Sequence, residues 1–440
     1  MSGRAVRRPL SLQRSCVALI EKRKERSKVP ALFAVVTAFM ACAEEAPTAV
    51  PVRPAPASRH GALVDALVDD ARAFAFRDGD WLEDSGDAPF YGLAWLARRG
   101  ASKSLDREES ARLDAAVLRA KTLLSENLVD GDMHERIMAA LGLIEYVGVS
   151  DDRSARELVD DFVDRLDART RELGDYVTTG DEWSSALRAG GPTAVTARIA
   201  IVHSQYALLV GGARAKAHVD RALALDGTIR SRALRDLLDP ATRRQVRAYA
   251  AGPGQSEIFD APNVTMLLLK ARLFRLTKRE EFRLEARAIF AALQALKLTD
   301  APVRYASPSA KTSLGVDTRD LSTLSGQNEL ALGNLLLFEI TGDLRFVDEA
   351  DRLMDSVAAM RGPWCASQVH DPQACVQDCV AGEACVVGSC TMDRCTTGLL
   401  HHIVDGRLAS PADRELFCAG CNLQTLYVTG YRRMLAGEAY

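Results

Sequence analysis

The chain contains an internal repeat of helical hairpins. Six identical residues recur at an offset of 64, so that Leu273–Ala286 matches Leu337–Ala350. Each copy predicts a helix, a short polar turn and a second helix, because apolar residues return every three or four positions on both sides of the turn. The chain from 59 to 440 has room for about six such units. Repeats of this length build an open solenoid or a closed ring.

Helical periodicity extends through the whole body of the chain. In Leu344–Met360 the apolar residues form the single face of an amphipathic helix. Thr277 and Glu280 have the spacing of a capping box, which predicts that a helix begins there. Further helices with the same apolar stripe are expected over 151–173, 279–296 and 325–341.

The turn between the two helices is the most specific part of the repeat. The Thr341-Gly342-Asp343 turn predicts a helix end followed by a new N-cap. Together with Phe346 and Glu349-Ala350, it resembles the (α/α)6 toroid of the six-hairpin glycosidase-like superfamily. The resemblance covers 59–440 in outline and 263–361 most closely, without identifying a specific family. It implies an all-α ring of hairpins with its active site at one mouth; an open α-solenoid is the alternative.

The first 58 residues have the pattern of an exported protein. Nine Lys and Arg against two Glu within residues 1–28 precede an apolar run, Ala31 to Met40. Phe39-Met40-Ala41-Cys42 resembles a bacterial lipoprotein signal. That resemblance implies a signal peptide over 1–41, a lipid on Cys42 that binds the membrane, and a place in the bacterial cell envelope, as an outer-membrane or periplasmic lipoprotein. The Pro/Ala-rich residues 42–58 predict a tether. A non-lipidated secretory signal or a short membrane anchor is the alternative.

Eight of the ten cysteines lie in the last 76 residues. An even number in an exported chain predicts four disulfides, which would hold a cysteine-rich insert at 364–398 that has few large apolar residues. Zinc bound by Cys418-Ala-Gly-Cys421 with His401 or His402 is one alternative, and thiol exchange is another. We expect no metal and no other cofactor. The predicted disulfide cysteines are Cys365, Cys375, Cys379, Cys385, Cys390, Cys395, Cys418 and Cys421.

Four polar clusters are expected in loops or at helix starts. The first, 78–92, combines acids with aromatic residues, as sugar sites do. The second spans 181–193, the third opens the helix at 325, and the fourth, 401–427, places two adjacent histidines beside an aspartate. Solvated loops, helix caps or a bridged final hairpin are the alternative explanations. Predicted catalytic residues are Glu329, His401, His402 and Asp405; predicted substrate-binding residues are Trp81, Asp87, Tyr91, Gln327, Asn328, Arg407, Asn422, Gln424 and Tyr427.

The sequence constrains the function less than the fold. A net charge of −3 argues against binding to nucleic acid, and the chain has no P-loop, HExxH or GxSxG motif. The lipoprotein resemblance and the toroid resemblance together imply an exported, lipid-anchored protein that binds or hydrolyses glycans at the mouth. A non-catalytic surface scaffold that binds another protein and a zinc-dependent toroid enzyme are the alternatives.

Overall fold

The computed structural model describes most of the body of the chain, and residues Val52 to Tyr440 form one compact unit. Helices dominate this unit, and its strands are short. Most of the cysteine-rich insert (366–394), the N-terminal signal and Cys42 lie outside the described residues. Those residues are 54–75, 88–239, 242–308, 321–365, 395–399, 402–404, 407–408 and 419–440.

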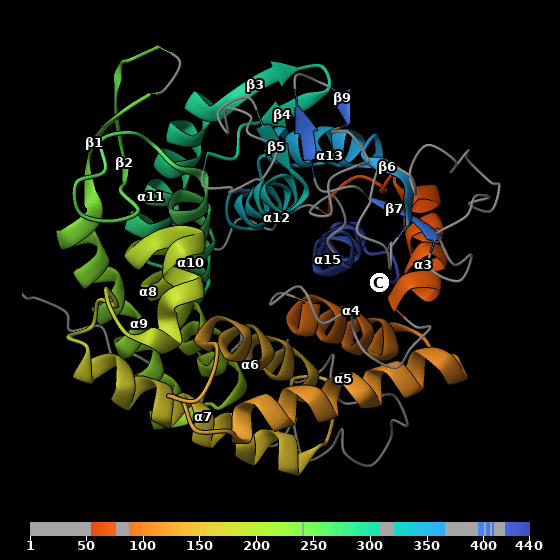
Figure 1. Cartoon of the computed structure of the whole chain (residues 1–440), viewed down its shortest axis with the longest axis horizontal. Coiled ribbons are helices and arrows are strands. Elements are labelled where there is room, and N and C mark those ends of the chain that lie inside the picture. Colours follow the sequence, from red (N-terminus) through yellow and green to blue (C-terminus); the bar gives the residue numbers. More distant parts are fainter. Residues whose placement is uncertain are drawn as a thin grey trace, which may run out of the picture. The chain divides into compact units, whose positions relative to one another are not determined.

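The helices form two concentric layers, which Figure 1 shows in a view down the ring. Each outer helix is followed in the chain by an inner helix. The inner layer consists of α4 (Ala88–Ser102), α6 (Met133–Val147), α8 (Ser184–Leu209), α10 (Asp260–Thr277), α12 (Leu324–Thr341) and α15 (Ala419–Leu435). The outer layer consists of α3 (Gly61–Ala75), α5 (Arg107–Ser125), α7 (Arg153–Glu172), α9 (Gly212–Ala233), α11 (Glu280–Leu293) and α13 (Leu344–Ala358).

The inner layer closes on itself. Each inner helix packs against the next one along the chain, and α15, the last, packs against α4, the first. An open solenoid would leave its first and last units apart. The prediction of a closed ring of helical hairpins is therefore confirmed.

The two repeat copies share one turn chemistry. The hydroxyl groups of Thr277 and Thr341 each donate to a carbonyl four residues earlier, at 2.7 and 2.6 Å, and each accepts the amide two residues later, at 3.2 Å in both cases. The intervening residues, Lys278 and Gly342, are left-handed, with φ of 56° and 70°. The recurring threonine therefore links the end of one helix to the start of the next.

This geometry corrects one prediction from sequence. The N-cap of α11 is Arg279, and no side chain caps the helix. Thr277 is instead the last residue of α10, so the predicted capping box with Glu280 is wrong. The predicted N-cap at Asp343 is confirmed, because its carboxylate accepts the amide of Arg345 at 3.1 Å.

The two layers differ in how they bury their residues. On α13 the predicted apolar stripe is buried while the opposite face meets solvent. The inner helices are buried nearly all round: in α10, every residue from Pro262 to Ala271 is buried. Apolar residues on all sides are expected for a helix enclosed by neighbours. The polar residues on the inner helices therefore stand out, and each requires a partner or a function.

The strands in the described residues all lie in connections that lead from an outer helix to the next inner one. Each sheet is small and antiparallel, and β5 pairs with β8, which joins the connection before α12 to the one before α15. The strands are β1 (Leu234–Leu238), β2 (Gln245–Tyr249), β3 (Lys297–Asp300), β4 (Val303–Tyr305), β5 (Leu321–Thr323), β6 (Arg361–Cys365), β7 (Cys395–Leu399), β8 (His402–Val404) and β9 (Arg407–Leu408).

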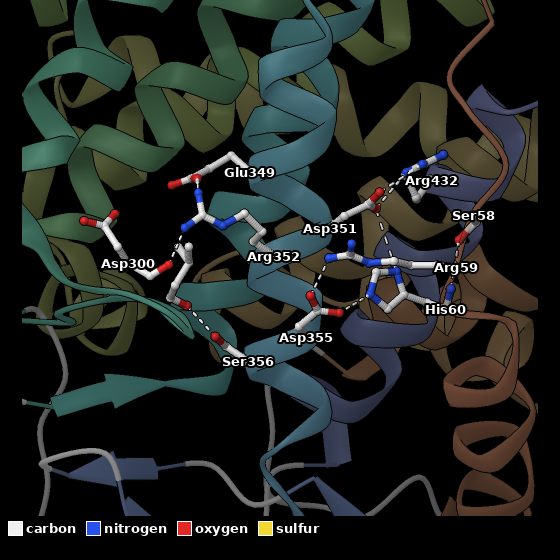
Figure 2. Close-up of polar contacts among 11 residues, drawn as sticks. Ser58, Arg59, His60, Asp300, Glu349, Asp351, Arg352, Asp355, Ser356 and Arg432 are labelled. Atoms are coloured by element: carbon white, nitrogen blue, oxygen red, sulfur yellow. Dashed lines mark hydrogen bonds and ion pairs between the residues drawn. The ribbon is translucent and has the colours of Figure 1, made fainter.

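The segment before α3 is held against the C-terminal helices, as Figure 2 shows. Arg432 of α15 binds Asp351 of α13 through two hydrogen bonds, at 2.9 and 3.0 Å, and donates to the carbonyl of Pro56 at 2.9 Å. The Nε2 atom of His60 lies 3.0 Å from a carboxylate oxygen of Asp355. Residues 54–58, which the sequence assigned to the tether, therefore belong to the body.

In the part of the chain that the structure describes, no helix is both long enough and apolar enough to cross a bilayer.

Candidate functional site

The two ends of the ring differ in their connections. Neighbouring inner helices run in the same direction, because Asn328 of α12 binds Thr425 of α15 near both helix starts, and Arg275 of α10 meets Glu339 of α12 near both ends. We call the end where the inner helices begin the loop end, and the other the turn end. The loop end carries every strand and the longest connections, whereas turns such as 341–344 are short. It corresponds to the expected mouth.

Three polar side chains from three inner helices meet at the loop end. The Nη1 atom of Arg198 on α8 lies 3.0 Å from Nδ1 of His134 on α6, and its Nη2 atom lies 4.0 Å from Oε1 of Glu329 on α12. All three are half-buried, and the residues on either side of Arg198 and of Glu329 are buried. The Arg198 and Glu329 side chains are 14% and 17% exposed, so solvent reaches both. We call this set the loop-end trio.

The helix starts place the trio. His134 lies in the first turn of α6, whose N-cap Asp132 accepts its backbone amide at 2.8 Å. Glu329 lies in the second turn of α12, which Thr323 caps. In α8 the helix breaks at Gly191, where φ is 71°, and a Cβ there would lie 2.6 Å from the carbonyl oxygen of Ala251. Arg198 therefore lies in the second turn after this break.

The trio combines a cation, an acid and an imidazole. A guanidinium only donates hydrogen bonds, so Nδ1 of His134 accepts from Arg198. The 4.0 Å contact between Arg198 and Glu329 is an ion pair but is too long for a hydrogen bond. Arg198 and Glu329 balance one another in charge. His134 and Glu329 thus lie on either side of the Arg198 guanidinium, and together they can offer a ligand a hydrogen-bond donor and an acceptor.

Several predicted substrate-binding residues are bound to protein groups instead. The Gln327 side chain accepts from the Tyr305 amide at 3.1 Å and donates to its carbonyl at 2.9 Å, which positions β4. Asn328 donates to the Cys421 carbonyl at 3.0 Å, and Gln424 donates to the Tyr91 hydroxyl at 2.9 Å. All of these side chains are buried. Asn328 and Gln424 therefore join α12 and α4 to α15, and Gln327 joins α12 to β4.

Two more predicted positions on α15 are also buried. Asn422 is buried near the helix start, and Tyr427 lies among the rings of Phe90, Tyr91 and Tyr431. Burial raises the pKa of Tyr427, so its hydroxyl stays protonated. Tyr427 packs inside the ring, and the geometry gives it a structural role.

The fourth predicted cluster reaches the same end of the ring. In the backbone register of β5 and β8, His402 lies opposite Thr323, the N-cap of the helix that carries Glu329. Arg407 follows on β9, which pairs with β8. Trp81, Asp87, His401 and Asp405 lie outside the described residues, so their roles stay predictions. The third and fourth clusters therefore come together, as does Tyr91 from the first.

The second predicted cluster has structural contacts. Glu182 accepts two hydrogen bonds from Arg169, at 2.6 and 2.9 Å, and Trp183 is buried. Thr193 donates its hydroxyl to the Ala250 carbonyl at 2.5 Å, which holds the restarted part of α8.

Sequence reasoning missed two members of the trio, His134 and Arg198. Neither belongs to a dense polar cluster in the chain. A usable signal existed: Arg198 is the lone charged residue between Thr193 and Leu209, shortly after the Gly191-Pro192 helix start. A single charge on an otherwise apolar inner helix is expected to face an opening rather than the core.

The described residues give no support for a metal centre. Among them, no group of three or more His, Cys, Asp or Glu side chains has a metal-binding arrangement. Cys421, one of the two CxxC cysteines, is disulfide-bonded.

Solved structures of sugar-processing proteins share this architecture. A cellobiose 2-epimerase from Spirochaeta thermophila matches with a TM-score of 0.54 and 12% identity, covering 86% of this chain and 97% of its own. A GH76 α-mannanase from Bacteroides thetaiotaomicron matches at 0.52 and 12%, covering 86% and 95%. A sugar epimerase from a ruminal bacterium matches at 0.51 and 11%, covering 83% and 98%.

At these identities the likeness concerns the fold and not the reaction. No protein-family model and no curated protein matches the chain. The structural neighbours and the closed double layer of helices together confirm the architecture expected from the repeat: the chain has the (α/α)6 toroid fold.

Proposed function

We propose that this protein is carbohydrate-active and that a glycan binds at the loop end, beside Glu329. The observation that carries the proposal is the meeting of His134, Arg198 and Glu329, from three inner helices, at a solvent-reached position in a mostly buried layer. Carboxylate, imidazole and guanidinium groups are suited to hydrogen-bond the hydroxyls of a sugar. Sugar epimerases and a mannanase with the same fold favour this ligand class.

Glu329 is the residue best placed to exchange a proton with the ligand. Its side chain is half-buried and lies 4.0 Å from the guanidinium of Arg198. A carboxylate in such a position can act as a base in hydrolysis or in epimerisation. His402 belongs to the same proposal, because its backbone lies beside the start of α12.

A binding screen against neutral oligosaccharides tests this proposal. Cello-, manno- and xylo-oligosaccharides are titrated into the purified body by calorimetry, with Glu329→Gln and Arg198→Met as variants. Binding of at least one series is expected, weakened about tenfold or more in both variants, which corresponds to about 1.4 kcal/mol.

Arg230→Met is the matched control, since Arg230 pairs with Glu285 in the outer layer and is more than half exposed. It should bind as the wild type does. No binding in any series, or equal binding by the trio variants, contradicts a glycan site at the loop end.

We also propose that the protein is exported and anchored by a lipid on Cys42. The basic residues, the short apolar run and the cysteine that follows support this proposal. In a bacterial host, the full chain is expected in the membrane fraction, and Cys42→Ser should abolish the lipid detected by mass spectrometry. Recovery of the wild-type chain without lipid would overturn the anchor.

The proposed oxidising compartment has a separate test. Cys421 is disulfide-bonded, and the backbone register sets Cys365 opposite Cys395 on β6 and β7. Four disulfides leave no free thiol among the eight C-terminal cysteines, so thiol titration of the unreduced, denatured body should give none. Two or more reactive thiols would contradict the four-bridge arrangement.

A further inference from the structure

We propose that Arg198 is a positioning residue that holds His134 as a neutral imidazole with its proton on Nε2, so that His134 donates and Glu329 accepts hydrogen bonds to the hydroxyls of a neutral sugar. The inference rests on the proposed function for the identity of the ligand. The protonation of His134, however, is a property of the protein alone.

The hydrogen bond between Arg198 and His134 determines where the imidazole proton lies. Nη1 of Arg198 is 3.0 Å from Nδ1 of His134, and a guanidinium carries no acceptor. The imidazole must therefore present a lone pair at Nδ1. A neutral histidine with a lone pair at Nδ1 carries its proton at Nε2, which makes that nitrogen a donor.

The position of Arg198 is fixed by the fold. The helix restarts after the break at Gly191, and the neighbours Ala197 and Ile199 are fully buried. Within the described part of the chain, its guanidinium makes one hydrogen bond, to His134, and one ion pair, to Glu329. One rigid group therefore sets the separation of the imidazole and the carboxylate, which come from α6 and α12.

The charges of the trio favour an uncharged ligand. Arg198 and Glu329 sum to zero, and His134 in this tautomer adds nothing. A ligand carboxylate or sulfate beside Glu329 would meet a like charge, and Arg198, whose charge Glu329 already opposes, would offset that repulsion only in part. A sugar hydroxyl both accepts and donates, so it can take a hydrogen bond from Nε2 of His134 and give one to Glu329.

The tautomer is tested on the ligand-free protein by nitrogen-15 NMR of labelled histidines, with the seven signals assigned by His→Gln variants. In the wild type, His134 should show a protonated Nε2 and an unprotonated Nδ1. Arg198→Met should allow both tautomers, and Arg198→Glu, which offers an acceptor, should move the proton to Nδ1. Arg230→Met should change nothing. Circular dichroism and thermal unfolding show whether each variant is folded.

A protonated Nδ1 in the wild type, or the same His134 signals in both folded Arg198 variants, overturns the role of Arg198. The choice of a neutral ligand is tested by comparing the binding of methyl β-glucoside and methyl β-glucuronoside. The two sugars differ only in that a carboxylate replaces the hydroxymethyl group. The neutral sugar should bind about tenfold more tightly. Equal or tighter binding of the glucuronoside overturns the choice of a neutral ligand.

If neither sugar binds, the proposed glycan site is contradicted. The NMR result still decides the role of Arg198 in that case. The two failures are therefore distinguishable.

Discussion

The two ends of the ring use the same six inner helices in opposite ways. At the turn end, Arg98 pairs with Glu145 at 2.6 Å, and its guanidinium lies 5.6 to 5.8 Å from the ring centres of Tyr427, Tyr431 and Tyr440. Its Nη1 also lies 3.6 Å from a methionine sulfur. At the loop end, among the described residues, Arg198 has one hydrogen bond and one long ion pair. Each end therefore has an arginine, and within the described part of the chain the arginine at the turn end has more partners.

Helix polarity explains part of this difference. The inner helices end at the turn end, where their carbonyl groups favour cations such as Arg98 and Arg275. Tyr431 donates to Glu339 there, and burial together with that carboxylate raises the pKa of Tyr431. We infer that packing and charge pairing at the turn end make a large contribution to the stability of the ring.

The largest effect on stability is expected from Arg98→Met. The substitution leaves Glu145 half-buried without its partner and removes the cation from three tyrosine rings. Loss of about 3 kcal/mol in the free energy of unfolding is expected, measured by denaturant titration. The matched change at the loop end, Arg198→Met, should cost less than about 1 kcal/mol. Equal losses at the two ends would break the comparison.

The second-largest effect on stability is expected from acid, acting near the turn end of the ring. His203 near the end of α8 and His218 at the start of α9 are stacked, with their Nδ1 atoms 3.0 Å apart. Burial lowers the pKa of both, most for His203, where the nearby Asp167 opposes the shift and Arg221 adds to it. The folded protein therefore keeps both imidazoles neutral at a pH where the unfolded chain binds protons.

The direction in which stability changes with pH follows from proton uptake by the unfolded chain. This contribution to stability is complete above about pH 6.5 and is lost as the pH falls below that value, since unfolding then binds protons. We expect a loss of about 1 to 3 kcal/mol between pH 7.5 and pH 4.5, which the double variant His203→Phe, His218→Phe should largely remove. A pH dependence unchanged in the folded double variant would show that other groups cause it.

A smaller effect is expected from Asn328→Ala at the loop end. Its amide nitrogen donates to the Cys421 carbonyl at 3.0 Å and to the Thr425 hydroxyl at 2.9 Å, so it joins α12 to α15. Asn334→Ala is the matched control: Asn334 is equally buried on the same helix but donates only to its own helix, to Leu330 at 2.9 Å. Asn328→Ala should cost about 1 to 2 kcal/mol more than the control. Equal costs would mean that the inter-helix bonds add nothing.

The fold was more predictable than the site for a physical reason. The recurrence of Thr277 at Thr341 reflects a local turn, and apolar periodicity reflects burial, so both appear in nearby residues. Counting units left an open solenoid and a closed ring, and the resemblance to toroid proteins favoured the ring. Side-chain contacts between helices leave no such local trace.

The site shows this limit clearly. Glu329 was found because it follows other polar residues at a helix start, yet its neighbours Gln327 and Asn328 are bound to protein groups. His134 and Arg198, separated by 64 residues, meet only in the folded ring. Density of polar residues in the chain therefore predicted which end of the ring is polar, but not which side chains remain accessible there.

The smallest effect on stability, and the sharpest test of the comparison, is expected from Glu329→Gln. Glu329 is 4.0 Å from Arg198 and partly exposed, and ion pairs of this kind contribute between zero and about 1 kcal/mol. Thermal unfolding should therefore shift by no more than a few degrees, while glycan binding falls about tenfold or more. Glu145→Gln at the turn end should show the reverse: a larger loss of stability and unchanged binding by the folded protein. If Glu329→Gln destabilised the ring as much as Glu145→Gln, the loop-end acid would be a structural group, and the division of roles between the ends would fail.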